Sequence, residues 1–218
     1  MRKKLEVGVI GLGKFGLQLA GTLTELGHRV IGVDADEQHI RSAQEMLAQV
    51  YLADATNRTV LEQLRFQDLD AVAVSVGESM ETSILVTLNL QEIGVPKIIV
   101  KAVSAAHRKV LKRLGAHHVI QPEADVAIHT AHRLVNPGML DLLPVGGGVL
   151  VQENVVEAWA GKNLLSLNLR TNSSILVAAV KHAGENEYRF VPDPNIPFGK
   201  GDKVLLIGKQ DAVLALKT

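Results

Sequence analysis

The stretch Val7–Gly16, VGVIGLGKFG, carries the glycine pattern G-x-G-x-x-G at the junction between an apolar run and an amphipathic segment. The apolar run predicts a strand, and the segment after it repeats apolar residues at helical spacing, at Phe15, Leu19, Leu23 and Leu26. In this setting Gly11 permits a tight turn, Gly13 lets backbone N–H groups approach a phosphate, and Gly16 lets the helix pack closely on the strand. The first turn of the helix adds partial positive charge. The stretch therefore predicts a phosphate-binding loop between a strand and a helix.

Asp34 follows a second apolar run, Arg29–Val33, and lies 18 residues beyond the last glycine of the loop. A carboxylate at this place accepts hydrogen bonds from the hydroxyls of a ribose. No basic residue stands beside Asp34 to receive a 2′-phosphate, which argues against NADP. The glycine loop and Asp34 together predict a Rossmann-type site for an adenosine nucleotide. Asp36 has two interpretations, a second contact to the ribose or the cap of the next helix.

A third apolar run ends in Ala53–Thr56, ADAT. The carboxyl ends of parallel strands border the crevice in which ligands bind, so Asp54 is a candidate for contact with the base or the ribose. The alternative is that Asp54 or Thr56 caps the helix expected to begin near Arg58.

Short apolar runs alternate with segments of helical period up to about residue 120. The runs expected to form strands are Val7–Ile10, Arg29–Val33, Val50–Leu52, Ala71–Ser75, Ile98–Val100 and His118–Ile120. The helical segments between them are Phe15–Leu26, Glu37–Ala48, Arg58–Arg65, Glu81–Ile93 and Ala105–Leu114. Only 3% of the residues are aromatic, whereas Val, Leu, Ile and Ala dominate, which suits strands buried on both faces. This alternation predicts an α/β fold with a doubly wound parallel sheet.

The last third of the chain has a different pattern. After a further helical segment that runs to Val135, the consecutive glycines in Pro144–Gly148 predict a linker. The stretches beyond it that read as strands are Val149–Val156, Ser174–Lys181, Tyr188–Val191 and Lys203–Ile207, and a short helix is expected over Asp211–Leu216. We therefore predict a Rossmann-like domain over residues 1–143 and a small β-rich α+β domain over residues 144–218.

The composition argues against several classes of protein. The 23 basic and 23 acidic residues leave no net charge that would attract nucleic acid. The absence of cysteine excludes disulfides and thiolate metal sites. No run of about 18 apolar residues predicts a membrane-spanning helix, and the amino-terminal residues Met1–Lys4 lead directly into a strand. We expect a cytoplasmic protein without a nucleic-acid partner.

Several motifs, in this order, resemble those of RCK domains, which regulate the conductance of potassium. They are Gly11–Gly16, Val33–Asp34, Asp54–Thr56, Glu81–Leu85 and Ile98–Lys101, and, in the last third, Gly161–Leu164 and Gly201–Gly208. The resemblance covers nearly the whole chain, including the C-terminal module of RCK proteins. It implies that the chain is the cytosolic regulatory subunit of a Ktr- or Trk-type potassium transporter. Such subunits form dimers that assemble into octameric or tetrameric rings on the inner face of a membrane subunit of the KtrB or TrkH kind.

The resemblance also implies that ATP and ADP exchange in the Rossmann cleft and change the shape of the ring. The cofactor-binding residues that it implies are Gly11, Gly13, Lys14, Phe15, Gly16, Asp34, Asp36, Asp54, Ala55, Thr56 and Lys101. Lys101 would offset phosphate charge, although a solvated lysine is the alternative. ATP-sensing relatives often carry arginine at the position of Lys14, where it reaches the γ-phosphate of a neighbour's nucleotide. Because lysine lacks the bidentate fork of arginine, NAD(H) is the alternative ligand.

Two further ligands follow from the resemblance. Glu123 matches a carboxylate near the dimer interface that helps to bind a divalent cation beside the phosphates, and a glutamate that favours the helix dipole explains it equally well. Some relatives bind cyclic di-AMP between two C-terminal modules through an arginine and an asparagine. Arg170 matches the arginine, but Leu176 stands where the asparagine is expected.

The alternative function is an NAD-dependent oxidoreductase whose substrate site forms between subunits. Such an enzyme needs a general acid or base and a substrate domain of substantial size. The segment from Val149 to Thr218 is short, and its one histidine is His182. We therefore expect that the protein is not an enzyme.

Overall fold

The computed structural model describes residues 3–76, 79–135, 139–146 and 148–216. The chain divides into two compact units, Met1–Pro122 and Glu123–Thr218. This division falls in the first turn of helix α6 (Pro122–Val135). The sequence predicted a boundary after residue 143, which would place the whole of this helix in the first domain. The limits of the functional domains stay a prediction. Within the described ranges, no helix is long and apolar enough to cross a membrane.

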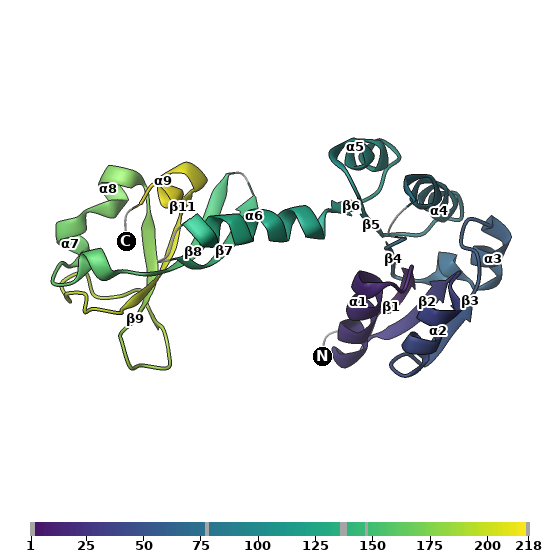
Figure 1. The fold of residues 1–218 in the computed structure, drawn as a ribbon, viewed down its shortest axis with the longest axis horizontal. Coiled ribbons are helices and arrows are strands. Elements are labelled where there is room, and N and C mark those ends of the chain that lie inside the picture. Colours follow the sequence, from purple (N-terminus) through teal and green to yellow (C-terminus); the bar gives the residue numbers. More distant parts are fainter. Residues whose placement is uncertain (1–2, 77–78, 136–138, 147, 217–218) are drawn as a thin grey trace. The chain divides into compact units, whose positions relative to one another are not determined.

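The first unit alternates strands and helices along the chain. Its elements are β1 (Glu6–Ile10), α1 (Lys14–Glu25), β2 (Arg29–Asp34), α2 (Glu37–Gln44), β3 (Gln49–Leu52), α3 (Arg58–Gln63), the 3-10 turn η1 (Phe66–Asp68), β4 (Ala71–Val74), α4 (Met80–Glu92), β5 (Ile98–Lys101), α5 (Ala105–Arg113) and β6 (His118–Ile120). The strands form one parallel sheet in the order β3-β2-β1-β4-β5-β6 (Figure 1). The predicted doubly wound parallel sheet is confirmed.

Helices cover both faces of this sheet, so the first unit has two cores. Neighbouring residues of β1 point to opposite faces: Ile10 packs in the core shared with α3, α4 and α5, and Val9 in the core shared with α1 and α2. Leu90 and Leu111 are fully buried on the first side, and Ile40 is 6% exposed on the second. Burying one such side chain contributes roughly 1.5–3 kcal/mol. Strands that are buried on both faces explain the continuous apolar runs of the sequence.

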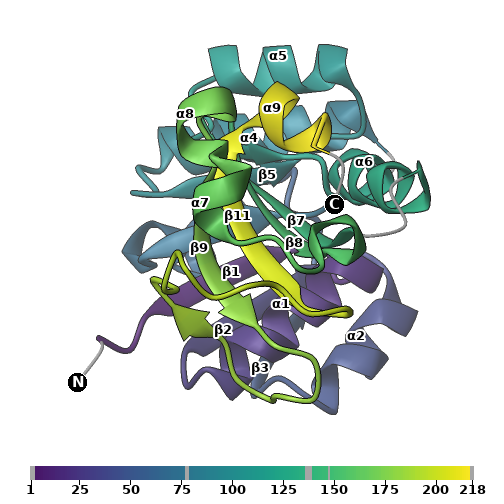
Figure 2. The same cartoon turned by 90° about the vertical axis from the view of Figure 1, so that its left-hand side faces the viewer.

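The second unit begins with most of the long helix α6 and continues as an antiparallel sheet. Its elements are α6 (Pro122–Val135), β7 (Met139–Gly146), β8 (Val149–Val155), η2 (Glu157–Trp159), α7 (Leu164–Leu167), α8 (Leu169–Ser173), β9 (Leu176–Lys181), β10 (Arg189–Phe190), β11 (Lys203–Lys209) and α9 (Gln210–Leu214). The strand order is β10-β9-β11-β8-β7, and Figure 2 shows β11 running along β8 and β9. The predicted small β-rich α+β domain is confirmed.

The prediction of a linker over Pro144–Gly148 was partly wrong. Up to Gly146, Pro144–Gly148 belongs to strand β7, and Gly146 is paired with Val149 of β8. Gly147 lies outside the described residues. The helices α7 and α8 were not predicted at all.

The second unit has a core of its own, formed by residues of β8, β9, β11 and the turn that follows β8. The rings of Trp159 and Phe198 meet edge to face, with centroids 5.4 Å apart and an interplanar angle of 61°. Leu150 of β8 and Leu206 of β11 are buried beside them in the same cluster. An edge-to-face pair of this kind is worth about 0.5–1.5 kcal/mol beyond the area that it buries.

Candidate functional site

The glycine loop lies at the point where the strand order of the first sheet changes direction. The N–H of Gly11 donates to the carbonyl of Val33 at 2.8 Å, and the N–H of Ser75 donates to the carbonyl of Ile10 at 2.7 Å, so the loop is held between β2 and β4. Gly11 has a φ of 88°. A Cβ at Gly11 would lie 2.6 Å from the carbonyl carbon and oxygen of Ser75. This turn therefore requires glycine, and it opens into the crevice where parallel sheets bind ligands.

The other two glycines of the motif differ in what surrounds them. A Cβ at Gly16 would lie 1.8 Å from the carbonyl oxygen of Gly11, so Gly16 lets α1 pack against the loop. A Cβ at Gly13 would have no neighbour among the described residues closer than 3.8 Å, the distance to Cε1 of His39. Gly13 precedes the first residue of α1, its cap has no side-chain hydrogen bond, and the first turn has no acidic residue among the described ones. The N–H groups at the start of α1 are thus available to an anion.

Asp34 connects the glycine loop to the second helix. Its Oδ2 accepts from the N–H of Leu12 at 2.5 Å, and its Oδ1 accepts from the N–H of Asp36 at 2.8 Å. The side chain is 11% exposed, at the edge of the crevice. A ribose hydroxyl would therefore bind to a carboxylate that the backbone already holds in place. Contact with a ribose stays a prediction.

His39 of α2 is a neighbour of the site that the sequence analysis missed. Its Nδ1 lies 3.1 Å from Oδ2 of Asp34, and its ring borders the space above Gly13. The side chain is 44% exposed, so it is accessible from solvent. No pattern in the sequence signals this position, because the contact depends on how the first turn of α2 lies against the loop.

Asp36 caps the second helix. Its Oδ1 accepts from the N–H of Gln38 at 2.7 Å, and α2 begins at the next residue, Glu37. The capping interpretation of Asp36 is confirmed, whereas a contact with the ribose stays a prediction.

The end of the third strand forms a local turn. Oδ1 of Asp54 accepts from the N–H of Thr56 at 2.9 Å and from its hydroxyl at 2.7 Å. Ala55 is buried. The predicted cap of α3 by Asp54 or Thr56 was wrong, because the cap is Asn57, whose side chain accepts from the N–H of Thr59 at 3.0 Å. Asp54 and Thr56 bond to each other because two residues are the natural span of an Asx turn. Their contact with adenosine stays a prediction.

Two lysines stand near the start of α1. Lys101 ends β5, and its Nζ lies 5.8 Å from the centroid of the Phe15 ring in the first turn of α1. Lys14 is the first residue of α1 and is exposed. The structure thus brings Lys101 and Phe15 together, and the positive charge of Lys101 lies on the side of the sheet edge that borders the glycine loop.

Glu123 lies in the first turn of α6 and is exposed. Across the described ranges, no three His, Cys, Asp or Glu side chains gather closely enough to hold a metal ion. The predicted cation stays a prediction.

A buried Ser–His pair packs α4 against α5. The N–H of Val103 donates to Nδ1 of His107 at 3.3 Å, which leaves the ring proton on Nε2, 2.8 Å from the Ser83 hydroxyl. Both side chains are fully buried, and burial lowers the pKa of His107. A nucleophilic serine needs a histidine that accepts its proton and a substrate that reaches it. This pair has neither, so its role is to satisfy buried polar groups in the core.

The two positions compared with cyclic di-AMP sites meet in one pocket of the second unit. Arg170 of α8 and Leu176 of β9 both line this pocket of about 410 Å³. Leu176 is 51% exposed, and its side chain offers no hydrogen bond to a base. Binding of cyclic di-AMP stays a prediction.

Comparison with known proteins assigns both parts of the chain to family models. Residues 7–122 match the TrkA-N domain, and residues 150–218 match the TrkA-C domain. The chain is 37% identical to Ktr system potassium uptake protein C of Bacillus subtilis, over 84% of this chain and 83% of that protein. It is 32% identical to Ktr system potassium uptake protein A of Vibrio alginolyticus, over 94% of this chain and 93% of that protein.

Solved structures show the same fold. The GsuK channel superposes with a TM-score of 0.68 at 16% identity, over 98% of this chain and 39% of the channel chain. A structure of the GsuK channel bound to NAD superposes with a TM-score of 0.63 at 16% identity, over 96% of this chain and 38% of that one. The chain therefore belongs to the TrkA family, with a TrkA-N domain followed by a TrkA-C domain, and the resemblance to RCK domains is confirmed.

Proposed function

We propose that this chain is the nucleotide-sensing regulatory subunit of a potassium uptake transporter. The observation that carries the proposal is the start of α1, where a glycine loop leaves the space above Gly13 open and Asp34 lies at its border. This arrangement is suited to a phosphate and its ribose. The relatives named as Ktr potassium uptake proteins support the transport context.

The proposed regulation is a change in the ring of subunits on exchange of nucleotide. A ligand shifts a conformational equilibrium only by as much as it binds one conformation more tightly than the other. ATP would therefore favour one arrangement of the ring and ADP another. The partner would be a membrane subunit that conducts potassium, with this chain bound to its cytoplasmic face.

Lys14 affects which nucleotide the chain is expected to bind. A lysine can attract a γ-phosphate as a point charge but cannot grip it with two parallel hydrogen bonds. NAD(H) is therefore the alternative ligand, and the GsuK channel, a protein of the same fold, binds NAD. Calorimetric titration of the full chain with ATP, ADP, NADH and NADPH separates these ligands, and no saturable heat with any of them contradicts the proposal.

The Asp34 carboxylate provides the matched mutational test. Asp34→Asn keeps an acceptor oxygen but removes the charge, and we expect nucleotide affinity to fall at least about tenfold, as for the loss of a charged hydrogen bond. Asp68→Asn, which removes an exposed carboxylate of η1 outside the predicted site, serves as the control. Unchanged affinity in Asp34→Asn would place the ribose elsewhere.

The transport role needs the membrane partner. We expect the chain to co-purify with a potassium-translocating membrane subunit encoded in the same genome, and expect uptake of rubidium, a potassium substitute, to depend on both. Uptake with Asp34→Asn should then lose its response to added nucleotide. Uptake that is the same with and without this chain would contradict the proposed role.

The proposal assigns no catalytic step to the chain. Steady oxidation of NADH with any member of a panel of small carbonyl substrates would favour the oxidoreductase alternative instead.

A further inference from the structure

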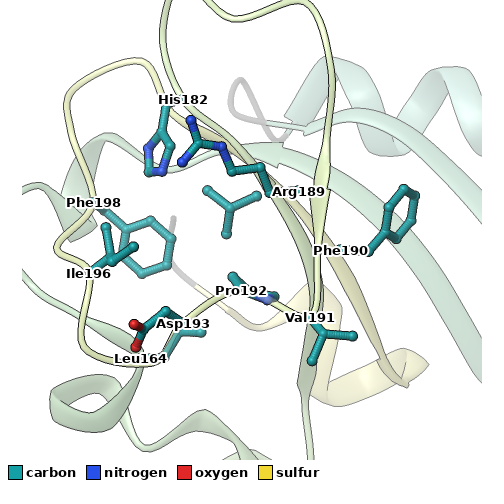
Figure 3. A pocket seen from close by; sticks show the side chains of 10 residues that line it. Leu164, His182, Arg189, Phe190, Val191, Pro192, Asp193, Ile196 and Phe198 are labelled. Atoms are coloured by element: carbon teal, nitrogen blue, oxygen red, sulfur yellow. The ribbon is translucent and has the colours of Figure 1, made fainter.

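A second pocket of the TrkA-C unit, as we call the second unit (Glu123–Thr218), lies between β9, β10 and the segment that follows them. Its volume is about 250 Å³, and its lining residues are Leu164, Val180, His182, Arg189, Phe190, Val191, Pro192, Asp193, Ile196 and Phe198 (Figure 3). We call it the His182 pocket. Arg170 does not line it, so its polar groups differ from those of the pocket compared with cyclic di-AMP sites.

His182 is held in one orientation by a buried carboxylate. Its Nδ1 lies 2.8 Å from Oδ2 of Asp202, which is only 1% exposed. Asp202 also accepts from the N–H of Ala183 at 3.0 Å and from the N–H of Gly199 at 2.8 Å. Burial alone would raise the pKa of Asp202, but these hydrogen bonds outweigh it and lower the pKa. The ionised carboxylate therefore accepts a hydrogen bond from Nδ1 and fixes the ring, which leaves Nε2 on the side of the pocket.

Arg189 provides charge at the same end of the pocket. Figure 3 shows its guanidinium and the ring of His182 pointing toward one another. Nη2 of Arg189 donates to Glu185, and within the described ranges the guanidinium forms no other hydrogen bond. Its remaining N–H groups can form the paired hydrogen bonds that suit a carboxylate.

The rest of the pocket suits an apolar body with no second charge. Val180, Ile196 and Phe198 contribute apolar surface, and Phe198 is fixed by its ring contact with Trp159. Asp193 lies at the opposite end in Figure 3. The N–H and side-chain amide of Asn195 lower the pKa of Asp193, so it stays ionised and repels a second anionic group. The volume is below the roughly 300–1,000 Å³ typical of pockets for drug-sized ligands, which favours a compact ligand.

We propose that the His182 pocket binds a compact monocarboxylate with an aromatic or branched aliphatic body. The carboxylate lies against the guanidinium of Arg189, and the apolar body lies against Phe198 and Ile196. The pocket is lined by residues of the second unit, whereas the glycine loop belongs to the first, so the proposal does not rest on the proposed nucleotide site.

The test uses benzoate as the probe, with benzamide as its uncharged counterpart of the same shape. We expect saturable shifts in the NMR spectrum of the isotope-labelled full chain, centred on His182, Arg189 and Phe198, with benzoate and not with benzamide. Arg189→Gln should weaken benzoate binding about tenfold or more, because a charge-assisted pair is lost. Lys209→Gln, which removes one exposed charge from the same unit without lining the pocket, should leave the affinity unchanged.

His182→Gln provides a second variant, and its folding is checked by the shifts of the core residues. We expect it to weaken benzoate binding as well, while the Arg189→Gln protein stays fully folded because Arg189 is exposed. The proposal is overturned if benzoate gives no saturable shifts, if benzamide binds equally well, if Arg189→Gln binds benzoate like the unmodified chain, or if the shifts centre on Arg170.

Discussion

Gly13 and Gly16 belong to one motif, but Gly16 is closely packed and Gly13 has open space beside it. Substituting each of them therefore gives a matched pair of variants. A Cβ at Gly16 would lie 1.8 Å from a backbone oxygen, whereas a Cβ at Gly13 would meet only His39 at 3.8 Å. We expect Gly16→Ala to lower the free energy of unfolding of the first domain by about 3 kcal/mol, because α1 must move away from the loop. Gly13→Ala should change it by less than about 1 kcal/mol. Urea denaturation followed by circular dichroism measures both.

The two substitutions also separate folding from binding. Gly13→Ala should fold normally yet weaken nucleotide binding, because its methyl group enters the space above the loop. Equal stability of the two variants would show that the close packing at Gly16 does not support the fold.

His39 is the residue at the site that only the structure reveals. We expect His39→Ala to weaken nucleotide binding several-fold, because the ring lies beside both Asp34 and Gly13. The free energy of unfolding should change by less than about 0.5 kcal/mol, since the pair with Asp34 is partly exposed. Ser42→Ala, on an exposed turn of the same helix, is the control. Nucleotide affinity that is the same in both variants would remove His39 from the site.

At the level of elements, the contact between α4 and α5 predicts how stability depends on pH. The pKa of His107 is lowered by burial from its usual 6.5. Below about pH 6.5 the unfolded chain therefore binds more protons at this residue than the folded chain does. The contribution of neutral His107 is complete above that pH and is lost progressively as the pH falls further.

Urea denaturation at pH 7.5 and at pH 5.5 tests this prediction. We expect the first domain to lose stability between the two values, and expect His107→Gln to lose less. His118→Gln replaces an exposed histidine of β6 and should behave like the unmodified chain. The prediction is wrong if His107→Gln shows the full pH dependence.

The elements also show which parts of the fold the sequence could predict. The parallel strands and their helices were predictable because each has a strong local pattern, namely a continuous apolar run or a helical repeat. Strand β7 (Met139–Gly146) has no clear local pattern, because a proline and a glycine usually break a strand, and it is the pairing with β8 that stabilises it. Helices α7 and α8 were missed because one ends at Asn168 and the other at Ser174, both in left-handed conformation, so neither is long enough to repeat.

The candidate site, too, could be predicted from the sequence only in part. The roles of the three glycines and the place of Asp34 follow from spacing along the chain. His39 and the bond between Asp54 and Thr56 do not, because they depend on how turns fold back at the strand ends. Sequence patterns thus predict which strand ends form the crevice but not the side chains that complete it.

At the level of the whole molecule, helix α6 has no buried residue among those described. Ala124, Ile128, Ala131 and Val135 are all exposed, and their spacing places them on one face of the helix. A stripe of this kind, with Val135 73% exposed, favours association with a second copy of the chain. We therefore expect the protein to form at least dimers.

Sedimentation of variants tests this association. The double variant Ile128→Asp with Val135→Asp should sediment as a smaller species than the unmodified chain, because charges would be buried in the contact. His129→Asp adds a charge at a polar position on a different face of the same helix and should leave the assembly intact. A monomeric unmodified chain would contradict the prediction.

The ring contact between Trp159 and Phe198 has a practical consequence for these experiments. Trp159 is the one tryptophan of the chain, and it lies in the TrkA-C unit. Its emission spectrum therefore reports on that unit alone, whereas circular dichroism follows both. Since Phe198 lines the His182 pocket and touches the indole edge to face, a ligand there should alter the intensity of the emission directly. The protein thus carries a built-in fluorescent probe that distinguishes events in its second domain from binding at the glycine loop.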